Sequence, residues 1–189
     1  MTKERPILFS GSMVRAILDG SKTQTRRIAK EFDDSQNLDG ILARYPRQKG
    51  CRYGEPGDRL WVRESWCHFP ADAPDGMGEM VYYRAHPGNG DPRADRTMER
   101  NGVKWQPSIH MPRSLSRITL EITDVRVQRL QGISEEDAQA EGAPPASNPG
   151  GDGESYVAGF GDLWESIHGP SGWNANPWVW VITFRKVEQ

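Results

Sequence analysis

Apolar and polar residues alternate in several segments of the chain, and this period of two predicts β-strands. The alternation is found in residues 59–66, 116–130 and 177–187, and two further strands are predicted for the short apolar run 6–9 and for residues 79–85. Within residues 116–130 we expect one strand that includes Ile118, Leu120 and Ile122 and a following strand over 125–130. In the last segment Trp178 and Trp180 share one face, and we expect them in the core rather than around a ligand.

Three other segments show the spacing or the end signals of a helix. Apolar residues of 13–18 recur on one helical face, and Gly20 stands where a C-cap glycine belongs. Ser10 or Ser12 can cap the start of this helix. A Ser-Glu-Glu-Asp sequence at 134–137 resembles a capping box and predicts a helix over 135–141.

The third predicted helix covers residues 156–168, where Phe160, Leu163, Trp164 and Ile167 have helical spacing. Polar, Pro-rich and Gly-rich loops separate the predicted elements at about 29–50, 69–78, 86–104 and 143–155. We expect these loops to be irregular, with a turn within 38–43. A chain of 189 residues with these elements predicts one domain, residues 1–189.

Composition changes this picture little. The net charge of −2 gives no strong field toward nucleic acid, although Arg outnumbers Lys and its planar fork suits phosphates and bases. Cys51 and Cys67 are expected to be free thiols. Because no segment reaches 18 apolar residues and no signal sequence is visible, we expect a cytoplasmic protein without a membrane partner.

Candidate functional residues are most concentrated in the segment Lys22-Thr-Gln-Thr-Arg-Arg27, which contains an amine, two hydroxyls and two guanidiniums. The same composition is also typical of a solvated basic loop. In a regular strand Lys22 and Thr25 would point to opposite faces, so a shared site requires a bend between them.

This cluster resembles the signature of the ASCH domain, G-x-K-T-x-T-x-R, here Gly20, Lys22, Thr23, Thr25 and Arg27. The pattern G-D-x-L-W-V-R-E at 57–64 and W-x-P-S-I-H-M-P-R at 105–113 are similar to further sequences of the longer variants found in bacteriophages and prophages. The resemblance implies an α+β fold with a PUA-like mixed, mostly antiparallel β-barrel and a few short helices.

One branch of that family, the small N4-acetylcytidine amidohydrolases, implies a catalytic set. By the resemblance, Thr25 is the nucleophile, Lys22 the proton acceptor and Glu141 the proton donor. A lysine can accept a proton at neutral pH only if its pKa falls well below its ordinary value of about 10.4. Candidate substrate-binding residues are Thr23, Arg26, Arg27, Arg63, Glu64, Ser108, His110 and Arg113.

We expect a cleft between the 22–27 segment, the Glu141 helix end and the 108–113 loop. Glu64 stands on an otherwise apolar strand face, and we expect it to pair with Arg27 or Lys22. The predicted partner is a nucleoside or a nucleic acid, RNA rather than DNA. No cofactor is expected, and the Cys and His spacings do not predict a metal site.

Two alternatives use overlapping residues. In a non-catalytic RNA- or DNA-binding module, the basic residues would hold phosphate while Tyr82, Trp66 or Trp105 stack on bases. In an ASCH-type ribonuclease, His110, Lys22 and Tyr82 would be the acid–base groups.

Overall fold

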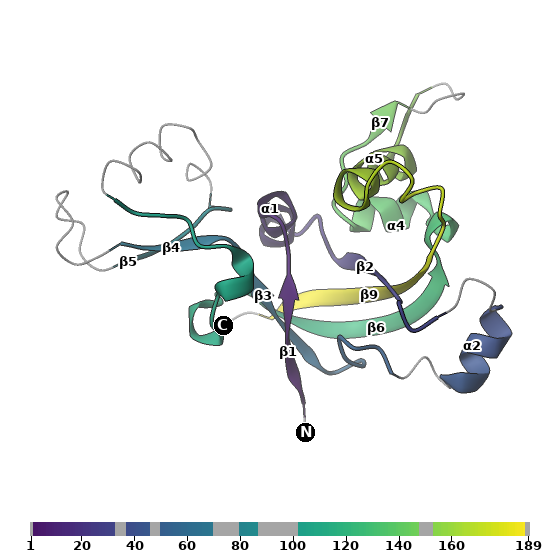
Figure 1. Ribbon diagram of the computed structural model, residues 1–189, viewed down its shortest axis with the longest axis horizontal. Coiled ribbons are helices and arrows are strands. Elements are labelled where there is room, and N and C mark those ends of the chain that lie inside the picture. The colour runs from purple at the N-terminus through teal and green to yellow at the C-terminus, as the bar shows by residue number, and fades with distance from the viewer. Residues whose placement is uncertain are drawn as a thin grey trace.

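A computed structural model describes residues 2–32, 37–45, 50–69, 80–86, 102–147 and 153–187. Its main element is a five-stranded sheet in the order β1-β3-β6-β9-β2 (Figure 1). The five strands are β1 (Glu4–Leu8), β3 (Arg59–Arg63), β6 (Thr119–Arg129), β9 (Trp178–Val187) and β2 (Gln24–Ile28). Only β1 and β3 are parallel, and the other neighbours in this sheet are antiparallel.

Two short hairpins extend from this sheet. They consist of β4 (Trp66–Phe69) with β5 (Met80–Tyr83) and of β7 (Ala146–Ser147) with β8 (Glu154–Ser155). The helices are α1 (Gly11–Asp19), α2 (Leu38–Arg44), α4 (Glu135–Ala140) and α5 (Tyr156–His168). Figure 1 shows α4 and α5 together beside β2 and β9, whereas α2 lies at a distance from them.

The helix ends follow from local sequence. Ser10 caps α1, because its hydroxyl accepts from the Met13 amide, and Gly20 ends the helix in the left-handed conformation. Ser134 caps α4 and accepts from the Asp137 amide. These caps confirm two of the predicted helix starts.

The core lies on both faces of β9, the strand between β6 and β2. Trp178, Trp180 and Ile182 pack into a cluster with β1, α1, β3 and β6. Val179 and Val181 point the opposite way and pack against α4 and α5. The two tryptophans are therefore core residues, as the sequence predicts.

The α+β class and the mixed, mostly antiparallel sheet are confirmed, but the described strands do not close into a barrel. The end strands β1 and β2 each have one neighbour, so the sheet is open between them. The Arg27 side chain spans this opening and donates to the Leu8 carbonyl. A side-chain bridge thus stands where a barrel would have paired strands.

Several local predictions were wrong. Residues 38–44 form α2 rather than a turn, because Asn37 caps a helix whose Ile41 is buried. Residues 119–129 form one strand that continues through an irregularity between Ile122 and Asp124. The predicted strand over 59–66 ends at Arg63, and residues 146–147 and 154–155 pair, although this insertion was expected to be irregular.

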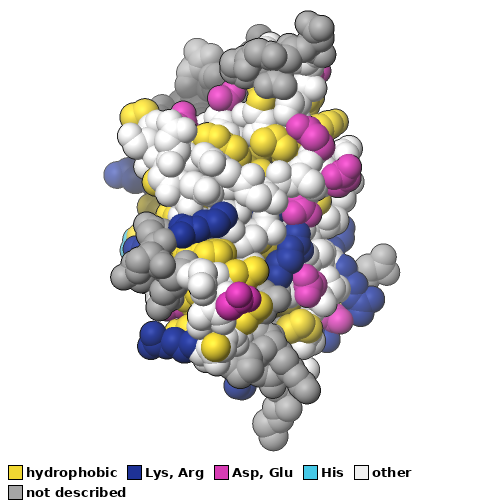
Figure 2. Space-filling model, turned by 90° about the vertical axis from the view of Figure 1, so that its right-hand side faces the viewer, with side chains coloured by type: hydrophobic (Ala, Val, Ile, Leu, Met, Phe, Trp, Pro, Cys, Tyr) yellow, Lys and Arg dark blue, Asp and Glu magenta, His cyan; other side chains and the backbone are white. Residues whose placement is uncertain are grey.

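Other expectations fall partly outside the described residues. Residues 33–36, 46–49, 70–78, 87–101 and 148–152 of the predicted insertions lie outside the described residues, as does residue 79 of the predicted strand 79–85. Cys51 and Cys67 are buried free thiols. Among the described residues, no helix has the length and apolar character needed to cross a membrane. Figure 2 shows basic and acidic side chains interspersed on one face of the molecule.

Candidate functional site

The site begins where the chain leaves α1 and meets the end of α4. Lys22 and Glu141 form an isolated antiparallel bridge, and the Thr23 amide donates to the Ala140 carbonyl. Gly142 follows in the left-handed conformation, with φ of 71°. A Cβ there would lie 3.0 Å from the Lys22 Cβ, so this glycine permits the close approach of the two segments.

The Lys22 ammonium is buried and fully hydrogen-bonded. Its Nζ donates to Glu141 Oε2 at 2.9 Å, to the Glu141 carbonyl at 2.7 Å and to the Gln24 carbonyl at 2.8 Å. An ammonium has three protons, and each has an acceptor here. Burial lowers the pKa of Lys22, and the neighbouring Glu141 carboxylate opposes that effect.

Arg26 extends this buried arrangement toward α4. It donates to Glu141 Oε1 at 3.0 Å and to Asp137 Oδ2 at 2.8 Å. Asp137 also accepts from Arg126 at 2.6 Å. Burial raises the pKa of Asp137, but hydrogen bonds from Arg126, Gln24 and Arg26 outweigh it and hold the pKa below its usual value. We call the set Lys22, Gln24, Arg26, Arg126, Asp137 and Glu141 the ionic network.

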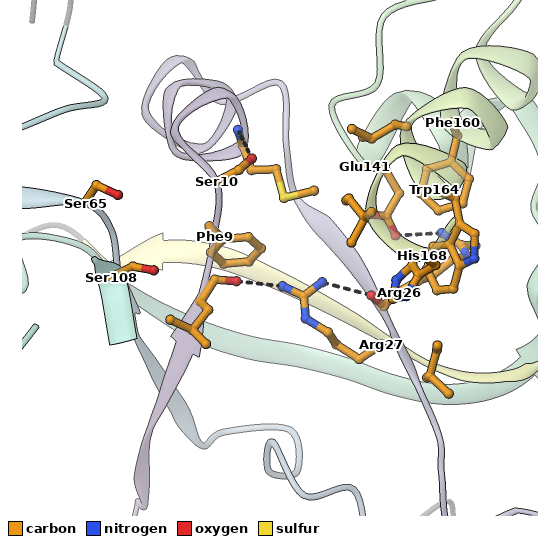
Figure 3. Close-up of a pocket in the computed structure, with 15 residues that line it drawn as sticks. Phe9, Ser10, Arg26, Arg27, Ser65, Ser108, Glu141, Phe160, Trp164 and His168 are labelled. Atoms are coloured by element: carbon orange, nitrogen blue, oxygen red, sulfur yellow. Dashed lines mark hydrogen bonds and ion pairs between the residues drawn. The ribbon is translucent and has the colours of Figure 1, made fainter. Parts of the chain in front are cut away.

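The alternate residues of β2, Thr25 and Arg27, take no part in the ionic network's ion pairs. Arg27 Nη1 donates to Thr25 Oγ1 at 2.6 Å and to the Arg26 carbonyl at 2.9 Å, and Nη2 donates to the Leu8 carbonyl at 2.9 Å. The guanidinium also lies 5.1 Å from the centre of the Phe9 ring. Figure 3 shows this side chain held between β1 and β2.

Consequently, the three residues of the implied catalytic set are only partly brought together. Lys22 and Glu141 are in direct contact, but the three acceptors of Lys22 Nζ do not include the Thr25 hydroxyl. Thr25 is fully buried and its hydroxyl accepts from Arg27 instead. The bend expected between residues 22 and 25 therefore directs Lys22 to Glu141 rather than to Thr25.

A cavity of about 400 Å³ opens beside these groups. Arg26, Arg27 and Glu141 line it, Phe9 borders it from the end of β1, and Phe160 and Trp164 border it from α5. Figure 3 shows the two aromatic borders on opposite sides of Arg27. The cavity thus combines a carboxylate and two guanidiniums with largely apolar walls.

His168, in the last turn of α5, also lines the cavity. Its ring centre is 4.2 Å from that of Trp164, and the ring planes are 33° apart. Trp164 is fixed by a hydrogen bond from Nε1 to the Gly172 carbonyl. Burial and, to a smaller extent, the Arg27 charge lower the pKa of His168, so the imidazole is neutral at pH 7.

The expected pairing of Glu64 with Arg27 or Lys22 was wrong. Glu64 instead accepts two hydrogen bonds from Arg117, at 2.9 and 3.0 Å. Arg117 precedes β6 and therefore reaches the end of β3, its neighbour in the sheet. Arg63 lies on the other face of β3 and donates to the Met111 carbonyl.

The 108–113 loop contributes one cavity residue among the predicted ones. Ser108 lines the cavity, and Met111 anchors the loop in the interior. His110 is exposed, and Arg113 forms a surface ion pair with Glu4. Thr23 is also exposed, so these three predicted substrate-binding residues lie outside the cavity lining.

Sequence reasoning missed several residues of the site, namely Phe9, Arg126, Asp137, Phe160, Trp164 and His168. One available signal was the i, i+4 spacing of Asp137 and Glu141, which places both carboxylates on one side of α4. A second was the same spacing of Phe160, Trp164 and His168 in the predicted helix 156–168, which places the three side chains on one face.

The residues of the ribonuclease alternative do not converge. Tyr82 packs in a separate small cluster with Cys67 and Val103, and neither Tyr82 nor His110 lines the cavity. In the described part of the chain, no three His, Cys, Asp or Glu side chains group as metal ligands would.

Comparisons with known proteins give one distant structural likeness. No family model matches the chain, and no curated protein sequence matches it either. One solved structure, protein EF3133 from Enterococcus faecalis V583, family-model DUF984, aligns with 99% of this chain and 82% of its own. The sequence identity is 13% and the TM-score is 0.43.

Proposed function

We propose that this protein is an ASCH-type, nucleoside-directed protein whose cavity takes a pyrimidine nucleoside and hydrolyses the amide of N4-acetylcytidine or a related acylated base. The observation that carries the proposal is the buried Lys22–Glu141 pair, whose carboxylate lines a cavity with aromatic walls. Ligand pockets of about 300–1,000 Å³ hold small molecules of this size. Carboxylates are also the usual acceptors for the N4 amino group of cytosine.

The pair can supply both the base and the acid of an amide hydrolysis. Transfer of one proton from Lys22 Nζ to Glu141 Oε2, along their 2.9 Å hydrogen bond, yields a neutral amine and a carboxylic acid. Burial favours such neutral forms, and it lowers the pKa of Lys22 in the same sense. In this state the Lys22 amine can act as the proton acceptor, and the Glu141 carboxylic acid can act as the proton donor.

The chemical steps balance with these groups. Lys22 takes the Thr25 proton as Oγ1 attacks the acyl carbon, and collapse of the adduct breaks the C–N4 bond while Glu141 protonates N4. Water then attacks the acyl-threonine ester and gives its proton to Glu141. Thr25 leaves with a proton from Lys22, which restores both groups. Thr25 must first turn from Arg27 toward Lys22, because its hydroxyl is bonded to Arg27 at 2.6 Å.

A non-catalytic module that binds nucleosides or RNA is the second candidate, and a specific observation favours it. All three protons of Lys22 have acceptors, and the Thr25 hydroxyl is buried against Arg27. In that case Lys22 and Glu141 hold the cavity in shape, and binding proceeds without bond cleavage.

The test is release of cytidine from N4-acetylcytidine by the wild type, Thr25→Val and Glu141→Gln. Thr25→Val keeps the side-chain shape and removes the nucleophile, and the exposed Thr123→Ala serves as the matched control. We expect release by the wild type and the control and loss in Thr25→Val of at least about 10²-fold. Binding of N4-acetylcytidine without release would select the second candidate, and neither binding nor release would contradict both.

A further inference from the structure

Arg27 differs from the other basic residues around the cavity because it forms no ion pair with a carboxylate in the described part of the chain, although the Glu141 charge acts on it from a distance. Lys22 and Arg26 pair with Glu141, and Arg26 and Arg126 pair with Asp137. The hydrogen-bond acceptors of Arg27 among the described residues are neutral, namely Thr25 Oγ1, the Arg26 and Leu8 carbonyls and the Tyr53 hydroxyl. It is half-buried and borders an apolar cavity.

A partly buried charge without an opposite charge is costly, and proteins normally pair such groups. The hydrogen bonds to Leu8 and Thr25 fix the guanidinium in the opening between β1 and β2, so it cannot simply extend into water. The cation therefore stands at the cavity in a fixed position, and none of the described carboxylates forms an ion pair with it, so a ligand anion could supply its counter-charge. His168 does not supply it, because an imidazole is either neutral or cationic.

We propose that the ligand of this cavity carries a phosphate that pairs with Arg27, so that the substrate is a nucleotide rather than a free nucleoside. This inference rests on the proposed function, since it takes the rest of the ligand to be a pyrimidine nucleoside. The phosphate has two possible sources, a 5′-monophosphate on a single nucleotide or the backbone of an oligonucleotide.

The positions of the aromatic side chains and of Arg27 fit a ligand that consists of a base and a phosphate. The Phe9 ring packs beside Arg27, while Phe160, Trp164 and His168 form the opposite border near Glu141. A base between these borders would present its N4 edge to Glu141, and the ribose phosphate would lie toward Arg27 and the open mouth. Leu8 and Ile167 line the cavity and have exposed side chains, so the cavity reaches solvent beside them.

The experiment compares equilibrium binding of N4-acetylcytidine, its 5′-monophosphate and a short oligonucleotide that contains one N4-acetylcytidine. For the wild type we expect the monophosphate to bind at least about tenfold more tightly than the nucleoside, as a charge-assisted contact allows. Raising the salt concentration should weaken monophosphate binding and leave nucleoside binding unchanged. A further gain for the oligonucleotide would assign the phosphate to a polymer backbone.

Variants separate the role of Arg27 from folding. Arg27→Gln should remove the preference for the monophosphate over the nucleoside, whereas Arg27→Lys should keep part of this preference. Arg185→Gln, which alters a surface ion pair with Glu121, is the matched control and should keep the full preference. The salt comparison uses the wild type alone, so it holds even if Arg27→Gln folds poorly.

Equal binding of nucleoside and monophosphate would overturn this inference and leave the proposed function intact. Absence of binding by all three ligands would overturn both.

Discussion

The charged side chains on the two faces of strand β2 differ in whether they are paired with carboxylates. On one face, Arg26, together with the preceding Lys22, is neutralised by Glu141 and Asp137 within 3.0 Å. On the other face, the acceptors that the described residues offer Arg27 are all neutral. The two adjacent arginines thus differ, since Arg26 belongs to the ionic network, whereas Arg27 borders the cavity and forms no ion pair with any described carboxylate.

The comparison teaches that burial alone does not identify a functional cation. Lys22 and Arg26 are the more deeply buried residues, yet both form ion pairs with carboxylates. The half-buried Arg27 is the cation that has no ion-pair partner among the described residues. We infer that the ionic network holds the end of α4 against β2, and that the face of Thr25 and Arg27 is directed to the ligand.

The largest expected effect is on the network itself. Glu141→Ala removes the carboxylate shared by Lys22 and Arg26 and leaves two buried cations, so we expect a loss of about 3–5 kcal/mol in the free energy of unfolding. Chemical denaturation measures it. Glu121→Ala, which breaks the exposed pair with Arg185, should cost less than about 1 kcal/mol. Equal losses in the two variants would show that the network does not stabilise the fold.

The adjacent arginines offer a sharper comparison. Arg26→Gln leaves the buried Glu141 with one cation and should cost about 3 kcal/mol, because hydrogen bonds between charged groups are lost in the interior. Arg27→Gln loses bonds to neutral acceptors but also removes an unpaired charge, so we expect a change within about 1 kcal/mol. Urea denaturation of both variants measures the difference. Similar losses in the free energy of unfolding for both variants would contradict the claim that Arg26 is held by ion pairs and Arg27 is not.

Asp137 makes the network sensitive to acid. Its folded-state pKa lies below its ordinary value of 3.8, so its contribution is fully present above about pH 4 and disappears as pH falls through the lowered pKa. Asp137→Asn should therefore be about 2 kcal/mol less stable than the wild type at pH 7. The gap should narrow below pH 4. Denaturation curves at pH 7 and pH 3 measure it, and a gap independent of pH would exclude Asp137 as an ionised member of the network.

Local sequence signals predicted the elements that build the site. Ser10 and Gly20 mark the ends of α1, Ser134 marks the start of α4, and the alternation of 178–187 marks β9. These features depend on neighbours in sequence, through caps and periodicity. The position of Lys22 next to Glu141 followed from the family resemblance rather than from any local rule.

The ion pairs within the site could not be predicted from such local sequence signals. Glu64 meets Arg117 and Lys22 meets Glu141 because strands and helix ends distant in sequence are packed together. The helical spacing of Phe160, Trp164 and His168 indicates a buried face, but it does not distinguish a core contact from a cavity wall. The strand register that places Arg26 and Arg27 on opposite faces depends on the pairing with β9.

The central claim is that a nucleoside binds between Phe9 and α5 beside Arg27. NMR chemical-shift mapping during titration with N4-acetylcytidine tests it most directly, with indole and imidazole signals of Trp164 and His168 and the guanidinium signal of Arg27 as reporters. We expect saturable shifts at these residues and little change at Trp61, which is outside the cavity lining. Shifts confined to residues outside the cavity, or no shifts at all, would contradict the account.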